Sequence, residues 1–363
     1  MLELTNEQRK CLGIPLISDS WLRIKPKPSP HHYYDTYAFI DGEKIVKVIQ
    51  VSDAEGREFY YEWSVDQELS DDGAHLLPKT DKGKPQLFTA STLEKVKRVG
   101  MGILFNDGVD IINFTTEQVY YRSRYSGKRI KTAEEFREWL NDWCEETGEG
   151  ELRDIGEFAS RKKVHQKIHE GDFFRFKINR TFWGYGRILV DYAAMRKQKI
   201  PFWDIFCGKP LCVAIYHIAT ENPNLIPSQL VGMKTLPSQM IMDNIFFYGD
   251  CEIIGNIPLV EGEIEYTIHY GESLSIREPN TYYYQCGKTF KTLRFNIPRY
   301  QFHNHSMSFF FHFTLPVLLE CIRCDSNQPY WDMMGTYYVE NDLRNPKNAK
   351  ELAVINRRLG IKS

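Results

Sequence analysis

Acidic side chains gather in one segment near the middle of the sequence. Residues 134–157 contain ten acidic and two basic residues, which gives a local charge of −8. A surface of this charge can bind a basic protein partner by electrostatic complementarity. A helix face that stays in water is the commoner arrangement for such a run, and both interpretations stay open. The candidate contact residues are Glu135, Glu138, Asp142, Glu145 and Glu146.

A basic segment with aromatic residues follows. Residues 161–180 contain seven Lys or Arg residues against two acidic ones. Phe173, Phe174 and Phe176 lie among the basic groups, and such a mixture can hold single-stranded nucleic acid by phosphate contacts and base stacking. Alternatively, the three rings belong to a core, and the acidic and basic segments complement each other across a seam between domains.

One pair of cysteines, Cys321 and Cys324, has the spacing of metal ligands. Three histidines lie just upstream, at His303, His305 and His312. The pair ends an apolar strand-like segment, whereas structural zinc ligands usually stand on polar turns, and the histidine spacing fits no common zinc pattern. A redox CxxC pair would need a βαβ context that this segment does not show. We therefore expect no bound metal, and we expect both thiols to be buried.

The sequence contains none of the common nucleotide-binding or hydrolase motifs. GxSxG, GxxxxGK[ST], GxGxxG and HExxH are all absent. Residues 287–289 have the tail of a phosphate-binding loop, but Tyr282 occupies the position of its first glycine. Catalysis would then need residues that converge only in the folded chain, which is disfavoured here. We therefore expect a protein that is not an enzyme and that needs no cofactor.

Length and composition describe a globular protein of two or three domains. The chain has 363 residues, of which 42% are hydrophobic and 26% charged, and its net charge of −2 provides no global attraction to nucleic acid or to an anionic membrane. Aromatic residues make up 14%, which favours sheet-rich domains. The N-terminal sequence lacks the pattern of a signal peptide, and the apolar stretch 306–322 is interrupted by polar residues and a proline. We infer a cytoplasmic protein whose eight cysteines are reduced.

In the first part of the chain, hydrophobic periodicity predicts a β-meander and then a helix. Asp41-Gly42 predicts a type I′ turn between two strands, and residues 106–108 predict a second hairpin. Residues 132–135 form a capping box, after which apolar residues recur at helical spacing. These are Phe136, Trp139, Leu140, Trp143 and Cys144. A second, mostly charged helical stretch is expected at 151–168.

Strand patterns resume after Gly171. In residues 173–178, Phe174, Phe176 and Ile178 share one face, which predicts a strand with these residues in the core and the alternate set outward or toward the seam. Further strands are expected at 185–190, 211–218, 245–248 and 252–254, helical turns at Pro227 and Pro237, and a terminal helix at 347–359. Five short strands suggest a small barrel or a strongly bent sheet.

Three segments of this region carry motifs. The run 171–189 begins with a G-D-x-F strand and contains Gly184-Tyr-Gly-Arg-Ile188. A strand at 213–218 follows, and the segment 248–259 ends in Ile-Gly-Asn-Ile-Pro-Leu. These motifs resemble the opening, the middle strand and the closing signature of the immunity protein 26 family of bacterial polymorphic toxin systems. The resemblance covers residues 167–261, and it implies a cytoplasmic protein without catalytic residues that binds and neutralises a cognate toxin.

We therefore expect an α+β, β-rich fold. The expected parts are an N-terminal antiparallel meander domain with a capping helix (1–150), a helical connector (151–166), a small bent-sheet or barrel-like immunity domain with peripheral helices (167–261) and a strand-rich extension that ends in a helix (262–363).

Further candidate contact residues lie at a predicted hairpin tip. Trp183, Tyr185 and Arg187 form the aromatic and arginine mixture that is typical of binding hot spots. Together with the acidic candidates, they predict an immunity-type protein that binds a toxin encoded next to it, with no role for a membrane. The alternative is a nucleic-acid-binding or sensor protein that uses residues 161–187, although nucleic acid is the less favoured partner.

Overall fold

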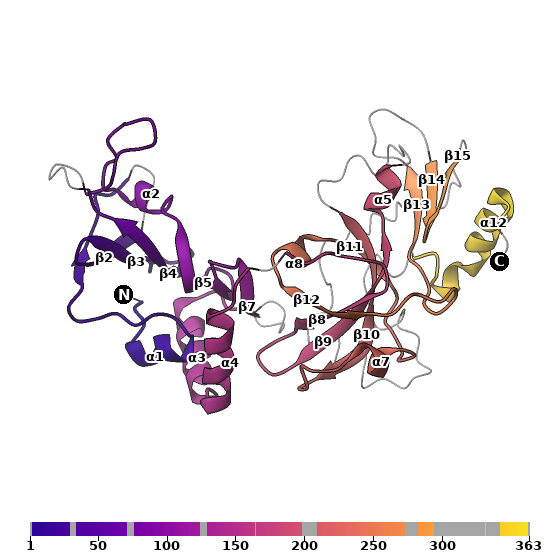
Figure 1. Cartoon of the computed structure of the whole chain (residues 1–363), viewed down its shortest axis with the longest axis horizontal. Helices are drawn as coiled ribbons and strands as arrows, with labels where there is room; N and C mark the ends of the chain where they lie inside the picture. The colour runs from indigo at the N-terminus through magenta and orange to yellow at the C-terminus, as the bar shows by residue number, and fades with distance from the viewer. Residues whose placement is uncertain are drawn as a thin grey trace. The chain divides into compact units, whose positions relative to one another are not determined.

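The computed structural model describes residues 2–29, 34–70, 76–123, 129–163, 165–197, 209–272, 282–293, 331 and 342–361. The chain divides into two compact units, residues 1–164 and 165–363 (Figure 1). The domain boundaries expected at 150, 166 and 261 stay predictions. The stretch 303–324, which holds the CxxC pair and the three histidines upstream of it, lies outside the described residues.

A seven-stranded antiparallel sheet forms the first unit. Its strands lie side by side in chain order, with β1 at one edge and β7 at the other. They are β1 (Leu22–Ile24), β2 (Asp35–Asp41), β3 (Lys44–Ser52), β4 (Phe59–Glu68), β5 (Arg98–Phe105), β6 (Val109–Asn113) and β7 (Gln118–Arg122). Consecutive strands pair because direct connections join neighbouring antiparallel strands. The predicted meander is confirmed.

Residues with positive φ shape two of the hairpins. Gly42 and Glu43 join β2 to β3, and of the two only Gly42 has a positive φ, 58°. A type I′ turn needs positive φ at both positions, so the predicted turn type is wrong although the hairpin is confirmed. Between β5 and β6, Asp107 and Gly108 have φ values of 52° and 146°, and short polar residues and glycine tolerate such values best.

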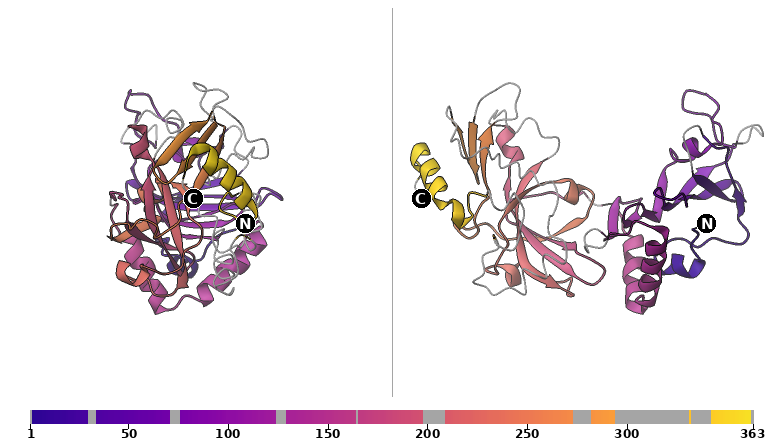
Figure 2. Two further views of the ribbon diagram at one scale, coloured as in Figure 1. Left: turned by 90° about the vertical axis from the view of Figure 1, so that its right-hand side faces the viewer. Right: turned by 180° about the vertical axis from the view of Figure 1, so that it is seen from behind.

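Three helices, α1 (Asn6–Cys11), α3 (Ala133–Glu145) and α4 (Glu149–Ala159), contribute to a core with the strands of this sheet. Both Figure 1 and the right-hand view of Figure 2 show α1 beside α3. As predicted, α3 begins at a capping box, and its Phe136 ring stacks on Phe105 of β5 with 4.5 Å between ring centres. The charged helix expected at 151–168 is α4, which ends at Ala159. A further single helical turn in the described part of this unit is α2 (Ala90–Leu93).

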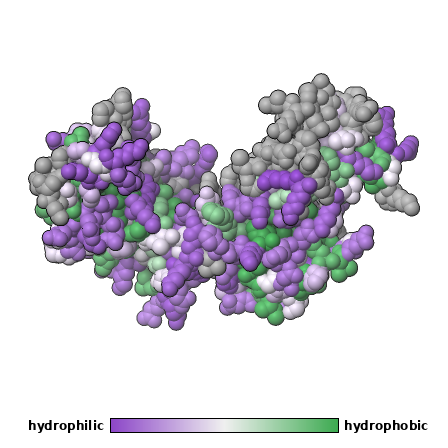
Figure 3. Space-filling model, turned by 45° about the horizontal axis from the view of Figure 1, so that its top comes forward, coloured by the Kyte–Doolittle hydropathy of each residue, from purple (hydrophilic) through white to green (hydrophobic). Residues whose placement is uncertain are grey.

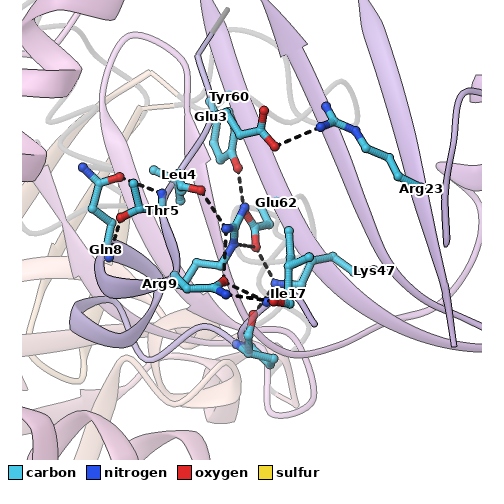
Figure 4. Close-up of polar contacts among 12 residues, drawn as sticks. Glu3, Leu4, Thr5, Gln8, Arg9, Ile17, Arg23, Lys47, Tyr60 and Glu62 are labelled. Atoms are coloured by element: carbon cyan, nitrogen blue, oxygen red, sulfur yellow. Dashed lines mark hydrogen bonds and ion pairs between the residues drawn. The ribbon is translucent and has the colours of Figure 1, made fainter. Parts of the chain in front are cut away.

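A buried ionic network fastens the N-terminal segment to this sheet (Figure 4). Glu62 of β4 has no exposed surface and accepts hydrogen bonds from Arg9 Nε at 2.8 Å and from Tyr60 Oη at 2.5 Å. Lys47 of β3 is equally buried, and its ammonium group donates to Glu62 and to the backbone oxygen of Pro15. Burial raises the pKa of the Glu62 carboxyl, but the two cations outweigh this effect and hold the pKa below its ordinary value. The network therefore contains an ionised carboxylate between two cations.

A five-stranded antiparallel sheet forms the centre of the second unit. Its spatial order is β11-β10-β9-β8-β12, so the two edge strands do not pair and the sheet stays open. The strands are β8 (Asp172–Lys177), β9 (Trp183–Asp191), β10 (Pro210–Thr220), β11 (Gln239–Met242) and β12 (Cys251–Asn256). With two sheet-rich units and few helices in the described residues, the predicted β-rich α+β class is confirmed.

Two local predictions in this unit are wrong. Residues 244–247 form the helical turn α8 (Asn244–Phe247) instead of a strand, since a short apolar run has no periodicity that separates the two structures. After Pro237 the chain forms β11, because pairing with β10 stabilises an extended backbone there. The helical turn at Pro227 is confirmed as α7 (Pro227–Leu230).

A smaller sheet and a last helix complete the described part of the second unit. The strands β13 (Ile268–Glu272), β14 (Tyr282–Cys286) and β15 (Thr289–Leu293) pair antiparallel, and Tyr283 of β14 packs with Leu189 and Cys212 of the five-stranded sheet. The helix α12 (Ala349–Leu359) lies beside this small sheet (Figure 1). Its Ile355 is buried in a cluster with Ile268, Tyr270 and Tyr284 of the sheet. The terminal helix expected at 347–359 is confirmed, and Gly360, with φ of 63°, ends it in the left-handed conformation that glycine tolerates. Short helical segments occur at α5 (Ala193–Arg196) and η2 (Pro346–Asn348).

Candidate partner-binding site

The two glycines of the Gly-Tyr-Gly-Arg element make room for aromatic rings of the neighbouring strand. Gly184 pairs with Phe176 and Gly186 with Phe174 across β8 and β9. A Cβ atom at Gly184 would lie 2.4 Å from the Phe176 ring, and one at Gly186 would lie 2.3 Å from the Phe174 ring. Side chains do not approach this closely, so each glycine is required by the ring above it.

The first and the last motif are bonded to each other. The backbone N–H of Ile257 donates to the carbonyl of Gly171 at 3.2 Å, and Asn256 Nδ2 donates to Asp172 Oδ1 at 2.7 Å. Gly171 has φ of 88°, and a Cβ atom there would lie 2.5 Å from the carbonyl oxygen of Ile257. These residues therefore hold the beginning of β8 against the end of β12.

Arg187 is a buried cation that holds the segment after β12. Its Nη2 donates to the backbone oxygens of Ile257 and Pro258 at 2.7 and 3.2 Å, and its Nη1 forms an ion pair with Glu263. The guanidinium carbon lies 4.5 Å from the centre of the Phe173 ring, within cation–π range. Since the Arg187 side chain has no exposed surface, it offers nothing for a partner to contact.

Tyr185 is also buried, and it anchors the connection between β10 and β11. Its Oη donates to the backbone oxygen of Asn222 at 2.7 Å and accepts from the N–H of Leu225 at 3.3 Å. Pro227 in the same connection lies over Gly255, where a Cβ atom would be 2.7 Å from the proline ring. Tyr185 and Gly255, one from each of two motifs, thus position this connection.

Trp183 is the one residue of the predicted hairpin set that keeps exposed surface; it is half-buried. The Arg175 guanidinium and the Lys177 ammonium lie 5.2 and 5.3 Å from the centre of its ring. Arg175 also binds Glu252 of β12 through Nε at 3.0 Å and Nη2 at 2.8 Å. We call Arg175, Lys177 and Trp183 the Trp183 surface. Of the three hairpin candidates, only Trp183 has surface that a partner could contact. Tyr185 is buried and supports the neighbouring connection.

The three phenylalanines of the basic segment are buried. Phe174 and Phe176 lie in the core as predicted, but the expectation that Phe173 faces outward or toward the seam is wrong, since it packs within its own unit. Tyr216 and Leu230 cover that side of the strand, so Phe173 has no exposed surface. None of the three rings is available to stack on a nucleic-acid base.

The acidic candidates lie exposed along α3 and at its C-terminal cap, away from the buried stripe. We call Glu135, Glu138, Asp142, Glu145 and Glu146 the acidic surface. Glu135 also caps the helix, and the backbone N–H groups of Lys131 and Thr132, which donate to its carboxylate at 2.6 and 3.1 Å, hold its pKa below the ordinary value. The other four carboxylates form no ion pair within the described residues and lie open to solvent.

The motifs on β8, β9 and β12 coincide with a known family. Residues 169–277 match the immunity protein 26 family. The match extends past β12 into β13, beyond the segment 167–261 recognised from its motifs, and it covers less than half of the chain. No significant match is found among curated proteins or among solved structures.

The immunity protein 26 motifs have internal roles in this structure, because their side chains pack on or bond to one another. Most of these motif residues are therefore buried and leave little side-chain surface exposed. Within the described ranges, no group of three or more His, Cys, Asp or Glu residues is placed to hold a metal ion. No helix in the same ranges is long and apolar enough to cross a bilayer.

Residues 221–235 hold exposed apolar side chains that sequence analysis did not select. Ile226, Val231 and Met233 all lie in this connection between β10 and β11. The helical turn expected at Pro227 was the only structural feature that the sequence predicted within residues 221–235. Period-two and helical patterns identify buried faces, and an irregular loop shows neither pattern.

Proposed function

We propose that this chain is an immunity-type protein of the cytoplasm that neutralises a cognate bacterial toxin by direct binding. The observation that carries the proposal is the immunity protein 26 match over residues 169–277. The buried, mutually bonded motif residues make a rigid framework, which is the support that a binding surface needs. The proposal requires neither catalysis nor a cofactor.

The test is a rescue experiment with the protein encoded by the adjacent reading frame. We expect that protein to arrest cell growth when it is produced alone, and we expect growth to resume when the full chain is produced with it. The two proteins should also co-purify. If the chain neither restores growth nor binds that protein, the proposal is wrong. Nucleic acid that co-purifies and is released by salt would favour the nucleic-acid alternative instead.

Charge reversal on the acidic surface should slow association with this partner. The variant Glu138→Lys/Asp142→Lys/Glu145→Lys is expected to associate about tenfold more slowly and with a weaker salt dependence, because charges at the rim of an interface act mainly on encounter. A matched control, Asp19→Lys/Glu55→Lys/Asp81→Lys, makes the same change in net charge at exposed positions elsewhere in the first unit. If stopped-flow measurements gave equal association rates for the two variants, the acidic surface would have no role in binding the partner.

Truncation of Trp183 should make the complex with the partner dissociate faster. If its half-buried ring is an anchor in the interface, Trp183→Ala is expected to cost about 2 kcal/mol of binding, or about 30-fold in dissociation rate. Tyr248→Ala serves as the control, since Tyr248 is an aromatic residue of the same unit with 43% of its surface exposed. An unchanged dissociation rate for Trp183→Ala would limit the tryptophan to a structural role.

A further inference from the structure

Residues 221–235, which make up most of the connection between β10 and β11, cover part of one face of the five-stranded sheet, and we call them the β10–β11 loop. It returns to the sheet at Thr235, which forms a β-bridge with Tyr216. Leu230 points inward, has no exposed surface and packs with Phe173 and Tyr216. The inner side of the loop is therefore part of the core of the second unit.

The outer side of the same loop carries three exposed apolar side chains among exposed polar ones. Ile226, Val231 and Met233 expose 56%, 42% and 41% of their surface. Single exposed apolar residues are common in proteins, but here three of the eleven large ones in the described residues fall within positions 226–233. Figure 3 shows apolar groups among hydrophilic ones on the surface of the second unit. These three side chains are absent from the buried core clusters, so folding does not explain them.

Arg175 joins the loop to the Trp183 surface. Its Nη1 donates to the backbone oxygen of Pro223 at 2.5 Å and to Asn224 Oδ1 at 3.4 Å, while its guanidinium lies over the Trp183 ring. Tyr185 bonds the same part of the loop from below, through Asn222 and Leu225. The first residues of the loop, 222–225, are therefore bonded directly to the two strands that carry the Trp183 surface.

The charges around the loop and the Trp183 surface are mostly positive. Four basic residues stand against two acidic ones; they are Arg175, Lys177, Arg180 and Lys234 against Glu221 and Glu252. An apolar centre with a charged rim is the usual anatomy of a protein interface, and a basic rim favours an acidic partner rim.

We infer that the β10–β11 loop is the specificity-determining part of the toxin interface, and that the toxin presents to it an apolar patch with an acidic rim. The inference rests on the proposed function and adds the site and the chemistry of its partner. Ile226, Val231 and Met233 make the apolar contacts, Trp183 anchors the edge, and Tyr185 is a positioning residue that acts through the loop.

The test measures binding of the full chain to the purified product of the adjacent reading frame. The variant Ile226→Ser/Met233→Ser is expected to dissociate at least about tenfold faster, with an unchanged melting temperature, because both side chains are exposed in the free protein. Val260→Ser is the matched control, since Val260 is an aliphatic residue of the same unit with 69% exposure outside the loop. Its dissociation rate should equal that of the wild type.

Two further variants test the positioning role and the rim. Tyr185→Phe keeps the ring in the core and removes the two hydrogen bonds to the loop, so dissociation should become several-fold faster. In the Ile226→Ser/Met233→Ser background the loop contacts are already lost, so the same substitution should leave the dissociation rate unchanged. Lys234→Glu should slow association several-fold. Equal effects of Tyr185→Phe in both backgrounds would overturn the positioning role, and faster association of Lys234→Glu would overturn the acidic rim.

The outcomes separate this inference from the proposed function. If the wild type binds the neighbouring product and Ile226→Ser/Met233→Ser dissociates at the wild-type rate, the loop is not the contact and the inference alone fails. If the wild type does not bind that product, the proposed function fails and the inference fails with it. Release of bound nucleic acid by the loop variants, with protein binding unchanged, would also overturn the inference.

Discussion

Glu62→Ala is expected to destabilise the first unit by about 3–5 kcal/mol, because it removes the only carboxylate between two buried cations within the described network. The side chains of Arg9 and Lys47 are 4% and 0% exposed, so water cannot replace the lost partner without local opening. Hydrogen exchange followed by mass spectrometry should show faster exchange in α1, β3 and β4, with protection in β8–β10 unchanged.

Asp66→Ala provides the matched control on the same strand. Asp66 pairs with Lys44 at 2.8 Å, but both side chains are largely exposed, and exposed ion pairs contribute little to stability. We expect the melting temperature of Asp66→Ala to equal that of the wild type to within about one degree. If Glu62→Ala were as stable as Asp66→Ala, the network would not be needed for the fold.

The same network gives a pH dependence of known sign. The folded chain holds the pKa of Glu62 below its ordinary value, so the ionised form contributes stability that is complete above the unfolded pKa of about 4.3. This contribution is lost as the pH falls through the lower, folded pKa. The Glu62→Gln variant has no ionisable carboxyl group at this position, so it lacks this contribution at every pH. The difference in unfolding free energy between wild type and Glu62→Gln should therefore be constant near neutrality and should shrink below about pH 4.

The sequence predicts the first unit well where local patterns determine its structure. The capping box at Thr132 and the apolar stripe of α3 follow from spacing alone, and both are confirmed. The network around Glu62 could not be predicted in this way. Its members come from α1, β3 and β4, and a charged residue within a strand is usually read as part of an exposed face. Only tertiary pairing brings the two cations to the carboxylate.

The same limit applies to the candidate site. Period-two alternation places Phe174 and Phe176 on one face of β8, and that face is the core. It cannot show whether the opposite face is covered. The β10–β11 loop and the segment held by Arg187 cover part of that face, which buries Phe173, Tyr185 and Arg187. Long-range contacts of this kind leave no periodic trace in the sequence.

Phe176→Ala is expected to destabilise the second unit by about 3–5 kcal/mol, since truncation of a buried phenylalanine loses transfer energy and leaves a cavity. The ring is 7% exposed and packs in a core cluster with Phe174, Ile178 and Ile188. Lys177→Ala is the control one position along the chain, on the opposite face of β8, and should melt with the wild type. Thermal melts that show equal stability for the two variants would contradict the packing of this face.

The glycine beneath this ring provides a second, sharper readout. Gly184→Ala places a methyl group 2.4 Å from the Phe176 ring, and such overpacking costs about 1–3 kcal/mol in an otherwise intact core. In the Phe176→Ala background the ring is gone and the methyl group fills part of the cavity, so Gly184→Ala should cost less there or even stabilise. The cycle should therefore show strong non-additivity in the unfolding free energies. Additive costs would mean that the ring does not require the glycine, whereas the expected coupling explains why the Gly-Tyr-Gly-Arg element accompanies a phenylalanine-rich first strand.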